Sequence, residues 1–280
     1  MTQRLLAAGH TVHVYNRSRG AIDALAKDGA TPADSAGQVA ERAEIVMTAL
    51  PTPDSVQAVF TEMAARARSG QIYIDHSTVS PGLNRWCAEQ LKSRGTDFLD
   101  APVSGGPAGA QAGTLTVMVG GEQGAFDRAL PVFRAFGKNI KLCGPAGAGQ
   151  VVKLINQLLV GVHTAAVAEA AVFGAKLGAD PRVVLEVIGT SFGGSTMMTR
   201  NVPRFISRDF GPATSITLLL KDLGLIHDEA KAANVPLLLG AVAEQRFLEA
   251  RARGMGENDM ASLVRLWEEA AGVTVDKPRS

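Results

Sequence analysis

Short apolar runs alternate with amphipathic segments through the first half of the chain. The amphipathic segments predict helices near 19–28 and 35–42, from Pro53 to about Arg68, and from Pro81 and Glu122 onward. The apolar runs predict strands at Thr11–Tyr15, Ile45–Leu50, Gln71–Asp75, Thr96–Asp100, Thr114–Val119 and Asn139–Cys143. Because continuous apolar strands are typical of a sheet covered on both faces, we expect a parallel, doubly wound α/β domain.

The pattern changes near residue 147, and nearly every later segment is helical. The run from Gly149 to about Leu177 is apolar almost all round, which predicts a long buried helix. Further helices are expected to begin near Asp180, Ser215, Leu237 and Asp259. We therefore expect an α/β domain over 1–146 and an all-helical domain over 147–280, joined by the long helix.

Composition and charge narrow the class of protein. Hydrophobic residues make up 46% of the chain, an ordinary fraction for a folded protein. The formal net charge is +1, so there is no excess of positive charge that would attract nucleic acid to the whole protein. No uninterrupted apolar run approaches the roughly 20 residues that a membrane-spanning helix needs. Cys87 and Cys143 lack metal-site spacing and fit reduced thiols. We expect a cytoplasmic protein without a metal, nucleic-acid or membrane partner.

The start of the long helix carries candidate chemistry. Lys153 and Asn156 are three residues apart, so they project side by side from one helix face. Burial lowers the pKa of a lysine towards neutral pH, and an amide beside it can orient a substrate oxygen. Lys153 is therefore a candidate proton donor, although a lone lysine at a helix start is more often a side chain whose charge reaches solvent.

A glycine-rich segment, Asp100–Leu115, follows a predicted strand. We expect it to form a loop in which Ser104 and the amides of Gly105 and Gly106 bind a small carboxylate. An ordinary turn rich in glycine and proline is the alternative interpretation of this segment.

Four segments together resemble the β-hydroxyacid dehydrogenase family, which includes 3-hydroxyisobutyrate dehydrogenase and 2-hydroxy-3-oxopropionate reductase. They are Asp100–Gly106, Gly113–Gly121, Gly147–Gln157 and Phe210–Leu223. The resemblance covers essentially the whole chain. It implies a Rossmann-type doubly wound domain followed by an all-α substrate and oligomerisation domain. It also implies hydride transfer between a nicotinamide cofactor and a small hydroxyacid or its semialdehyde.

The resemblance assigns roles to the residues of the candidate site. Lys153 would be the general acid and base, Asn156 would orient the substrate oxygen, and Ser104, Gly105 and Gly106 would bind its carboxylate. The positions that match cofactor contacts in the family are Leu50, Pro51, Thr78, Phe210 and Lys221. Plainer roles are also open: Thr78 as a helix cap, Phe210 as a core residue and Lys221 as a surface charge.

The end of the second expected strand bears on the choice of cofactor. Asn16, Arg17 and Ser18 stand where an acidic residue would bind the ribose hydroxyls of NAD. Arg17 can instead pair with a 2′-phosphate, so we expect NADP(H) over NAD(H).

The chain departs from the family at its beginning. Met1 to Ala8 reads as the helix that normally follows the first strand and a Gly-x-Gly-x-x-Gly loop, and neither of those is present in the sequence. Our hypothesis is a start codon assigned too far downstream, or a truncated gene. The missing central strand would leave neighbouring strands with unpaired backbone groups.

Two functional classes stay open. An enzyme, most like a 2-hydroxy-3-oxopropionate or 3-hydroxyisobutyrate type, is favoured by Lys153, Asn156 and Ser104. A non-catalytic oligomeric binding protein on a truncated Rossmann scaffold is the alternative, favoured by the missing loop. The apolar helical domain predicts a homodimer or homotetramer in either case.

Overall fold

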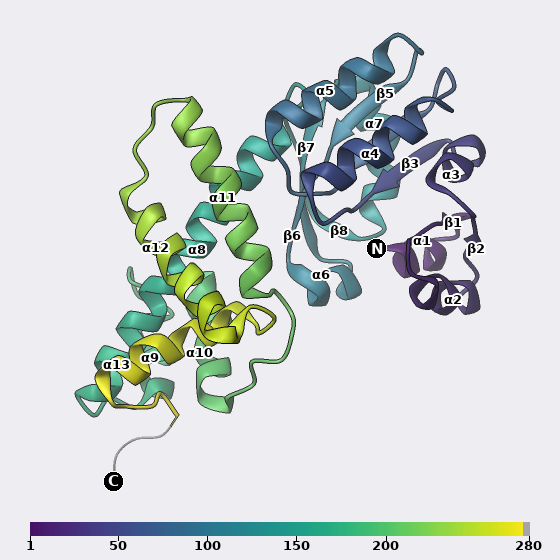
Figure 1. Ribbon diagram of the computed structural model, residues 1–280. Helices are drawn as coiled ribbons and strands as arrows, with labels where there is room; N and C mark the ends of the chain where they lie inside the picture. The colour runs from purple at the N-terminus through teal and green to yellow at the C-terminus, as the bar shows by residue number, and fades with distance from the viewer. Residues whose placement is uncertain (277–280) are drawn as a thin grey trace. The chain divides into compact units, whose positions relative to one another are not determined.

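The computed structural model describes residues 1–276 and contains two compact units, Met1–Lys153 and a second that begins at Leu154 (Figure 1). The first unit is α/β and the second is helical, as the family resemblance implies. The division falls inside the long helix, after the predicted boundary at residue 146. The first residues of that helix therefore pack with the α/β unit.

Three parallel strands form the centre of the first unit. They are β3 (Ile45–Thr48), β4 (Ile72–Asp75) and β5 (Asp97–Asp100), and all four residues of β4 are buried. The remaining strands are β1 (His13–Val14), β2 (Thr31–Pro32), β6 (Val103–Ser104), β7 (Leu115–Gly121) and β8 (Gly137–Gly144). The helices are α1 (Thr2–Ala7), α2 (Arg19–Lys27), α3 (Ala36–Arg42), α4 (Pro53–Ala64), α5 (Pro81–Lys92), α6 (Gly106–Ala112) and α7 (Gln123–Arg134).

Helices cover both faces of the sheet, which confirms the predicted doubly wound arrangement. Successive strand residues point to opposite faces, so Ile72 and Ile74 pack with α1 and α7, whereas Tyr73 packs with α3, α4 and α5. Both faces are therefore apolar, and only the strand ends are left for polar chemistry.

The sheet is mixed, so the prediction of a wholly parallel sheet was wrong. β7 pairs antiparallel with both β5 and β6, and the two pairings share one register, from Leu99 opposite Gly121 to Ser104 opposite Thr116. β5 and β6 thus continue one strand, and the chain returns through α6 at the tip of a hairpin (Figure 1). The segment expected as a glycine-rich loop is a strand end and a short helix, because pairing with β7 extends the strand.

β1 and β2 form a separate two-stranded parallel sheet. Within residues 1–276, β3 pairs with β4 alone, which leaves its other edge without a strand partner. Unpaired strand edges were expected from the sequence, and the topology contains them.

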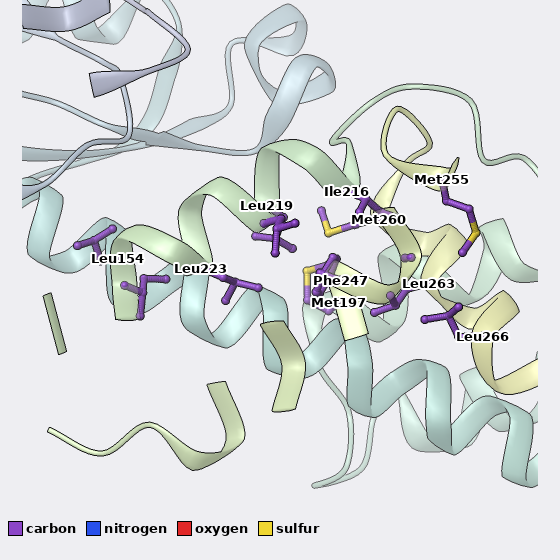
Figure 2. Packing of buried hydrophobic residues seen from close by; sticks show 13 residues of the cluster. Leu154, Met197, Ile216, Leu219, Leu223, Phe247, Met255, Met260, Leu263 and Leu266 are labelled. Atoms are coloured by element: carbon purple, nitrogen blue, oxygen red, sulfur yellow. The ribbon is translucent and has the colours of Figure 1, made fainter. Parts of the chain in front are cut away.

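The second unit consists of helices around an apolar core. Its helices are the later part of α8 (Ala148–Lys176), α9 (Pro181–Ile188), α10 (Thr196–Ser207), α11 (Ile216–Ala232), α12 (Leu238–Ala250), the short η1 (Arg251–Met255) and η2 (Met260–Leu263), and α13 (Val264–Ala271). Ile216, Leu219 and Leu223 of α11 pack with Phe247 of α12 and Leu263 of η2 (Figure 2). Helix α10 was not predicted.

A bidentate ion pair fixes the end of this core. Arg200 donates to both oxygens of the buried Asp259 carboxylate (2.9 and 2.6 Å), which also accepts from the amides of Thr214 and Ala261. Burial alone would raise the pKa of Asp259, but these hydrogen bonds lower it below its ordinary value.

Helix α8 is much less buried than its composition predicts. Its apolar residues include Ile155, Leu159 and Phe173, which are exposed. By length and mean hydropathy (1.7) it is the one helix among the described residues that meets the requirement for crossing a membrane. Helices of this length and hydropathy also occur in proteins that do not cross a membrane, where another subunit covers an apolar face.

A candidate active site at the start of helix α8

The loops after β3 and β4 meet at the carboxyl ends of these strands. The Asp75 carboxylate is fully buried and accepts from Thr48 Oγ1 (2.8 Å), Ser77 Oγ (2.6 Å) and Asn84 Nδ2 (2.9 Å). Ser77 Oγ in turn accepts from the Leu50 amide (2.9 Å). In a doubly wound fold this edge is where ligands bind, and Asp75 holds its two loops together.

Thr78 lies half-buried in the loop after β4. The plainer interpretation of Thr78 as a helix cap is wrong, because Ser80 caps α5 by accepting from the Leu83 amide. Leu50 is half-buried and Pro51 is exposed in the neighbouring loop. The structure thus brings these three predicted cofactor positions to one edge of the sheet.

A buried carboxylate from β5 holds the beginning of helix α8. Asp100 accepts from the Gly147 amide (2.6 Å) and the Gln150 amide (2.9 Å), and it is fully buried. Burial raises the pKa of the Asp100 carboxyl, and the two amide hydrogen bonds oppose that rise. The first amides of a helix need acceptors, and here the acceptor comes from a strand 47 residues earlier.

The side chain of Gln150 connects this helix to the loop after β4. Its Nε2 donates to the Ser77 carbonyl oxygen (2.7 Å), and its Oε1 accepts from the Val79 amide (3.3 Å). Gln150 is fully buried, so both groups of the amide are used on the backbone that flanks Thr78.

Lys153 lies one turn further along α8. It is only 7% exposed, and its Nζ donates to the carbonyl oxygen of Val103 (2.9 Å). That oxygen belongs to the peptide shared with Ser104, so the lysine and the predicted carboxylate-binding residues lie together. Gly105 and Gly106 follow with φ angles of 130° and 61°, values that favour glycine.

Asn156 and Lys221 belong to a second polar network, within the helical unit. Asn156 Nδ2 donates to Gln157 Oε1 (3.0 Å), and Gln157 Nε2 donates to Asp222 Oδ2 (2.5 Å). Lys221 Nζ lies 2.9 Å from Asp222 Oδ1, and its side chain is 23% exposed. Lys221 is therefore a half-buried, ion-paired lysine.

The remaining predicted cofactor residues lie elsewhere. Phe210 packs against the apolar cluster around Ala168 and Phe205, and the Arg208 guanidinium lies over its ring at 5.0 Å. This placement fits its plainer role as a core residue. The segment Asn16–Ser18 is an exposed turn after β1, in which the Asn16 side chain accepts from the Arg17 amide.

Several polar residues of these networks were not identified from the sequence as site residues, among them Asp75, Asp100, Gln150 and Asp222. The two aspartates at the ends of buried apolar strands were a usable signal, since a carboxylate there must find donors. Gln150 gave no such signal, because its partners are more than 70 residues away in sequence.

Two family models match the chain. The NAD-binding domain of 6-phosphogluconate dehydrogenase matches residues 1–144, and the NAD-binding domain of NADP-dependent 3-hydroxyisobutyrate dehydrogenase matches residues 147–267. Together they cover both units.

Curated relatives extend this similarity over nearly the whole length. The chain is 38% identical to 2-(hydroxymethyl)glutarate dehydrogenase of Eubacterium barkeri, over 98% of this chain and 93% of that protein. It is also 38% identical to 2-hydroxy-3-oxopropionate reductase of Escherichia coli, over 96% and 92% of the two chains.

Solved structures agree in fold. A 3-hydroxyisobutyrate dehydrogenase from Mycobacterium tuberculosis, determined with L-serine, superposes with a TM-score of 0.87 at 33% identity, over 95% of this chain and 93% of that one. Psf3 in complex with NADP+ and 2-OPP gives a TM-score of 0.87 at 25% identity, over 95% and 94% of the two chains.

We predict that Gly149→Ala lowers the free energy of unfolding by about 1–3 kcal/mol, as overpacking does. A Cβ at Gly149 would overlap the carbonyl oxygen of Met118 and lie 2.7 Å from the Asp100 carboxylate. Gly124→Ala is the matched control, since Gly124 also lies in a first helical turn but has open space around it. Urea denaturation of both variants measures the difference in the free energy of unfolding. Equal values would show that the start of α8 is not closely packed against Met118 and Asp100.

Proposed function

Since the chain belongs to the β-hydroxyacid dehydrogenase family of NAD(P)-dependent oxidoreductases, we propose that it interconverts a small hydroxyacid and its semialdehyde or oxo acid. The substrate is most like 2-hydroxy-3-oxopropionate or 3-hydroxyisobutyrate, the compounds named for relatives of this chain. The observation that carries the proposal is Lys153, held 2.9 Å from the peptide oxygen that precedes Ser104.

Lys153 moves the proton in this reaction. When bound, the nicotinamide supplies or accepts the hydride at the substrate carbon. During reduction the Lys153 ammonium gives a proton to the carbonyl oxygen, which becomes the hydroxyl, and during oxidation the neutral amine takes that proton back. A nearly buried position serves this role, because water is kept from the group that exchanges the proton.

The substrate carboxylate defines the other end of the site. We assign its binding to Ser104 and to the backbone amides of Gly105 and Gly106, where the absence of Cβ atoms allows close approach. Asn156, on the same face of α8 as Lys153, orients the reacting oxygen. A carboxylate site beside an ammonium favours substrates that carry an acid group close to the reacting carbonyl.

The chain has residues that fit a dinucleotide. The loops that carry Leu50, Pro51 and Thr78 are joined at the carboxyl edge of the sheet, which is the usual place for this ligand. We assign cofactor contacts to these residues and to Lys221, whose ammonium suits a phosphate or ribose oxygen. Phe210 is kept as a weaker assignment, because it is partly buried and packs against the apolar cluster around Ala168 and Phe205.

We further propose that the cofactor is NADP(H). Arg17 lies in the exposed turn after β1, together with Asn16 and Ser18, and no carboxylate is present in that turn. An arginine there can pair with a 2′-phosphate, whereas NAD(H) calls for an acidic residue.

Lys153→Ala should reduce kcat by about 100-fold or more, because the proton loses its donor, and should leave cofactor affinity nearly unchanged. Lys176→Ala is the matched control: Lys176 lies on the same helix and also donates to a backbone carbonyl, that of Ala271. Steady-state rates and a fluorescence titration with NADPH provide the two readouts. Near-normal turnover in Lys153→Ala would remove this lysine from the mechanism, and the non-catalytic alternative would regain support if no turnover occurred in the unmodified protein.

Arg17→Asp should weaken NADPH binding by about 10-fold or more relative to NADH, since it replaces a charge-assisted contact with repulsion. Arg19→Asp, at the exposed first position of α2, tests whether net charge alone has this effect. The measurement is the ratio of the two dissociation constants. An unchanged ratio in Arg17→Asp would exclude the contact with the 2′-phosphate.

We also propose that the helical unit mediates a homodimer or homotetramer and that the protein works in the cytoplasm. Exposed large apolar side chains gather in this unit, including Leu238, Leu239 and Val242 of α12, which are 63–79% exposed. A second copy of the chain would bury such a face by symmetry. Both cysteines are free thiols, which fits a reducing compartment.

Substituting Leu238 and Val242 together by Glu should lower the mass of the assembly towards that of one chain, because two charges would enter the proposed interface. Analytical ultracentrifugation measures this mass. Tyr15→Glu changes an exposed aromatic residue of the α/β unit and should leave the mass unchanged. A monomeric unmodified protein at micromolar concentration would contradict the proposal.

A further inference from the structure

We propose that Gln150 is a positioning residue, which transmits the conformation of the loop after β4 to Lys153. The inference rests on the proposed function, because it takes Lys153 as the proton donor and Thr78 as a cofactor contact. Gln150 itself touches neither substrate nor cofactor in this proposal, since it is fully buried.

Gln150 is held by hydrogen bonds at its backbone amide and at the end of its side chain. Its amide nitrogen donates to Asp100 (2.9 Å), and its side chain bonds to Ser77 and Val79. A fully buried residue with two side-chain hydrogen bonds to backbone groups and one from its own amide to a carboxylate has little freedom to shift without losing one of them, and each loss leaves a buried polar group unsatisfied. Movement of the loop therefore moves the helix start.

Lys153 lies only a short distance along α8 from Gln150. Lys153 follows Gln150 by three residues, so the two side chains leave the same face of α8 one turn apart. Lys153 Nζ donates to the carbonyl oxygen of Val103 at 2.9 Å. A displacement of α8 by about 1 Å is enough to cost on the order of 100-fold in rate when it misplaces a reacting group.

The two partners of the side chain explain why position 150 holds a glutamine. Ser77 presents a carbonyl oxygen and Val79 presents an amide N–H, one on each side of Thr78. At this side-chain length a carboxamide offers a donor and an acceptor together, whereas an ionised carboxylate only accepts. A ligand that orders the backbone around Thr78 would strengthen both bonds, and it would thereby hold the turn that carries Lys153.

Gln71 is a suitable control for Gln150. It precedes β4, whereas Gln150 bonds to the loop that follows β4. Gln71 is 4% exposed, donates to the carbonyl oxygens of Ala40 and Ala43, and accepts from the Arg68 amide. Its side chain has three backbone partners where that of Gln150 has two, and these partners lie in the same unit but not on α8. Replacing either glutamine by Met keeps the length of the side chain and removes its polar groups. Comparing Gln150→Met with Gln71→Met therefore separates a loss of stability of the α/β unit from a loss of positioning of Lys153.

The experiment uses the full chain without cofactor. In Gln150→Met, amide hydrogen exchange should become at least about 10-fold faster both at Ser77–Val79 and at Gly147–Lys153, because the two segments lose a shared restraint. In Gln71→Met both segments should exchange as in the unmodified protein. Gln150→Glu is the second variant: at a pH where its carboxyl is ionised it keeps the acceptor for Val79 but has no donor for Ser77, and exchange should change in the same direction.

Kinetics then complete the test. Gln150→Met should lower kcat by about 10- to 100-fold with KM for the hydroxyacid changed less than about 3-fold, whereas Gln71→Met should retain kcat. Faster exchange limited to Ser77–Val79, or unchanged kcat in a folded Gln150 variant, would overturn the proposal. If Lys153→Ala retained turnover, the proposed function would fail, but the exchange measurement would still report the coupling between loop and helix.

Discussion

The hydrogen bonds from the start of helix α8 to the buried Asp100 carboxylate join two segments that are far apart in the chain. A helix begins with amides that have no partner of their own, and a buried carboxylate needs donors. The two requirements are met together, since Gly147 and Gln150 donate to the oxygens of Asp100 at 2.6 and 2.9 Å. The placement of Lys153 depends on this contact, because the lysine lies on the next turn of the same helix.

Close packing at this point restricts the residues around the carboxylate. A Cβ on Gly120 would lie 2.8 Å from the amide nitrogen of Gly149, and one on Gly149 would lie 2.7 Å from Asp100 Oδ2. Both positions therefore require glycine for steric reasons, independently of any ligand. Gly120 on the strand and Gly149 on the helix thus let the helix approach the strand closely.

The sequence predicted most of the secondary structure and part of the site, for identifiable reasons. Strands such as β4 and helices such as α5 carry periodic apolar patterns with clear caps, and these patterns are local. The hairpin from β5 to β7 was misjudged because its strand is extended by pairing with residues further along the chain, against a local composition rich in glycine. Helix α10 was missed because polar residues and an internal Pro203 obscure its pattern. Lys153 and Ser104 could be found from chemistry and resemblance, whereas Gln150 could not, since its role comes from contacts 71 and 73 residues away.

In the proposed reaction, Lys153 and Ser104–Gly106 form a site for small carboxylated aldehydes. The most direct measurement compares the oxidation of NADPH by the unmodified protein with 2-hydroxy-3-oxopropionate and with glycolaldehyde, which has the same aldehyde but no carboxylate. The account predicts that kcat/KM is at least about 100-fold higher for the carboxylated aldehyde, since a charge-assisted carboxylate contact contributes about 1.5–3 kcal/mol per hydrogen bond. Equal values for the two aldehydes would contradict it.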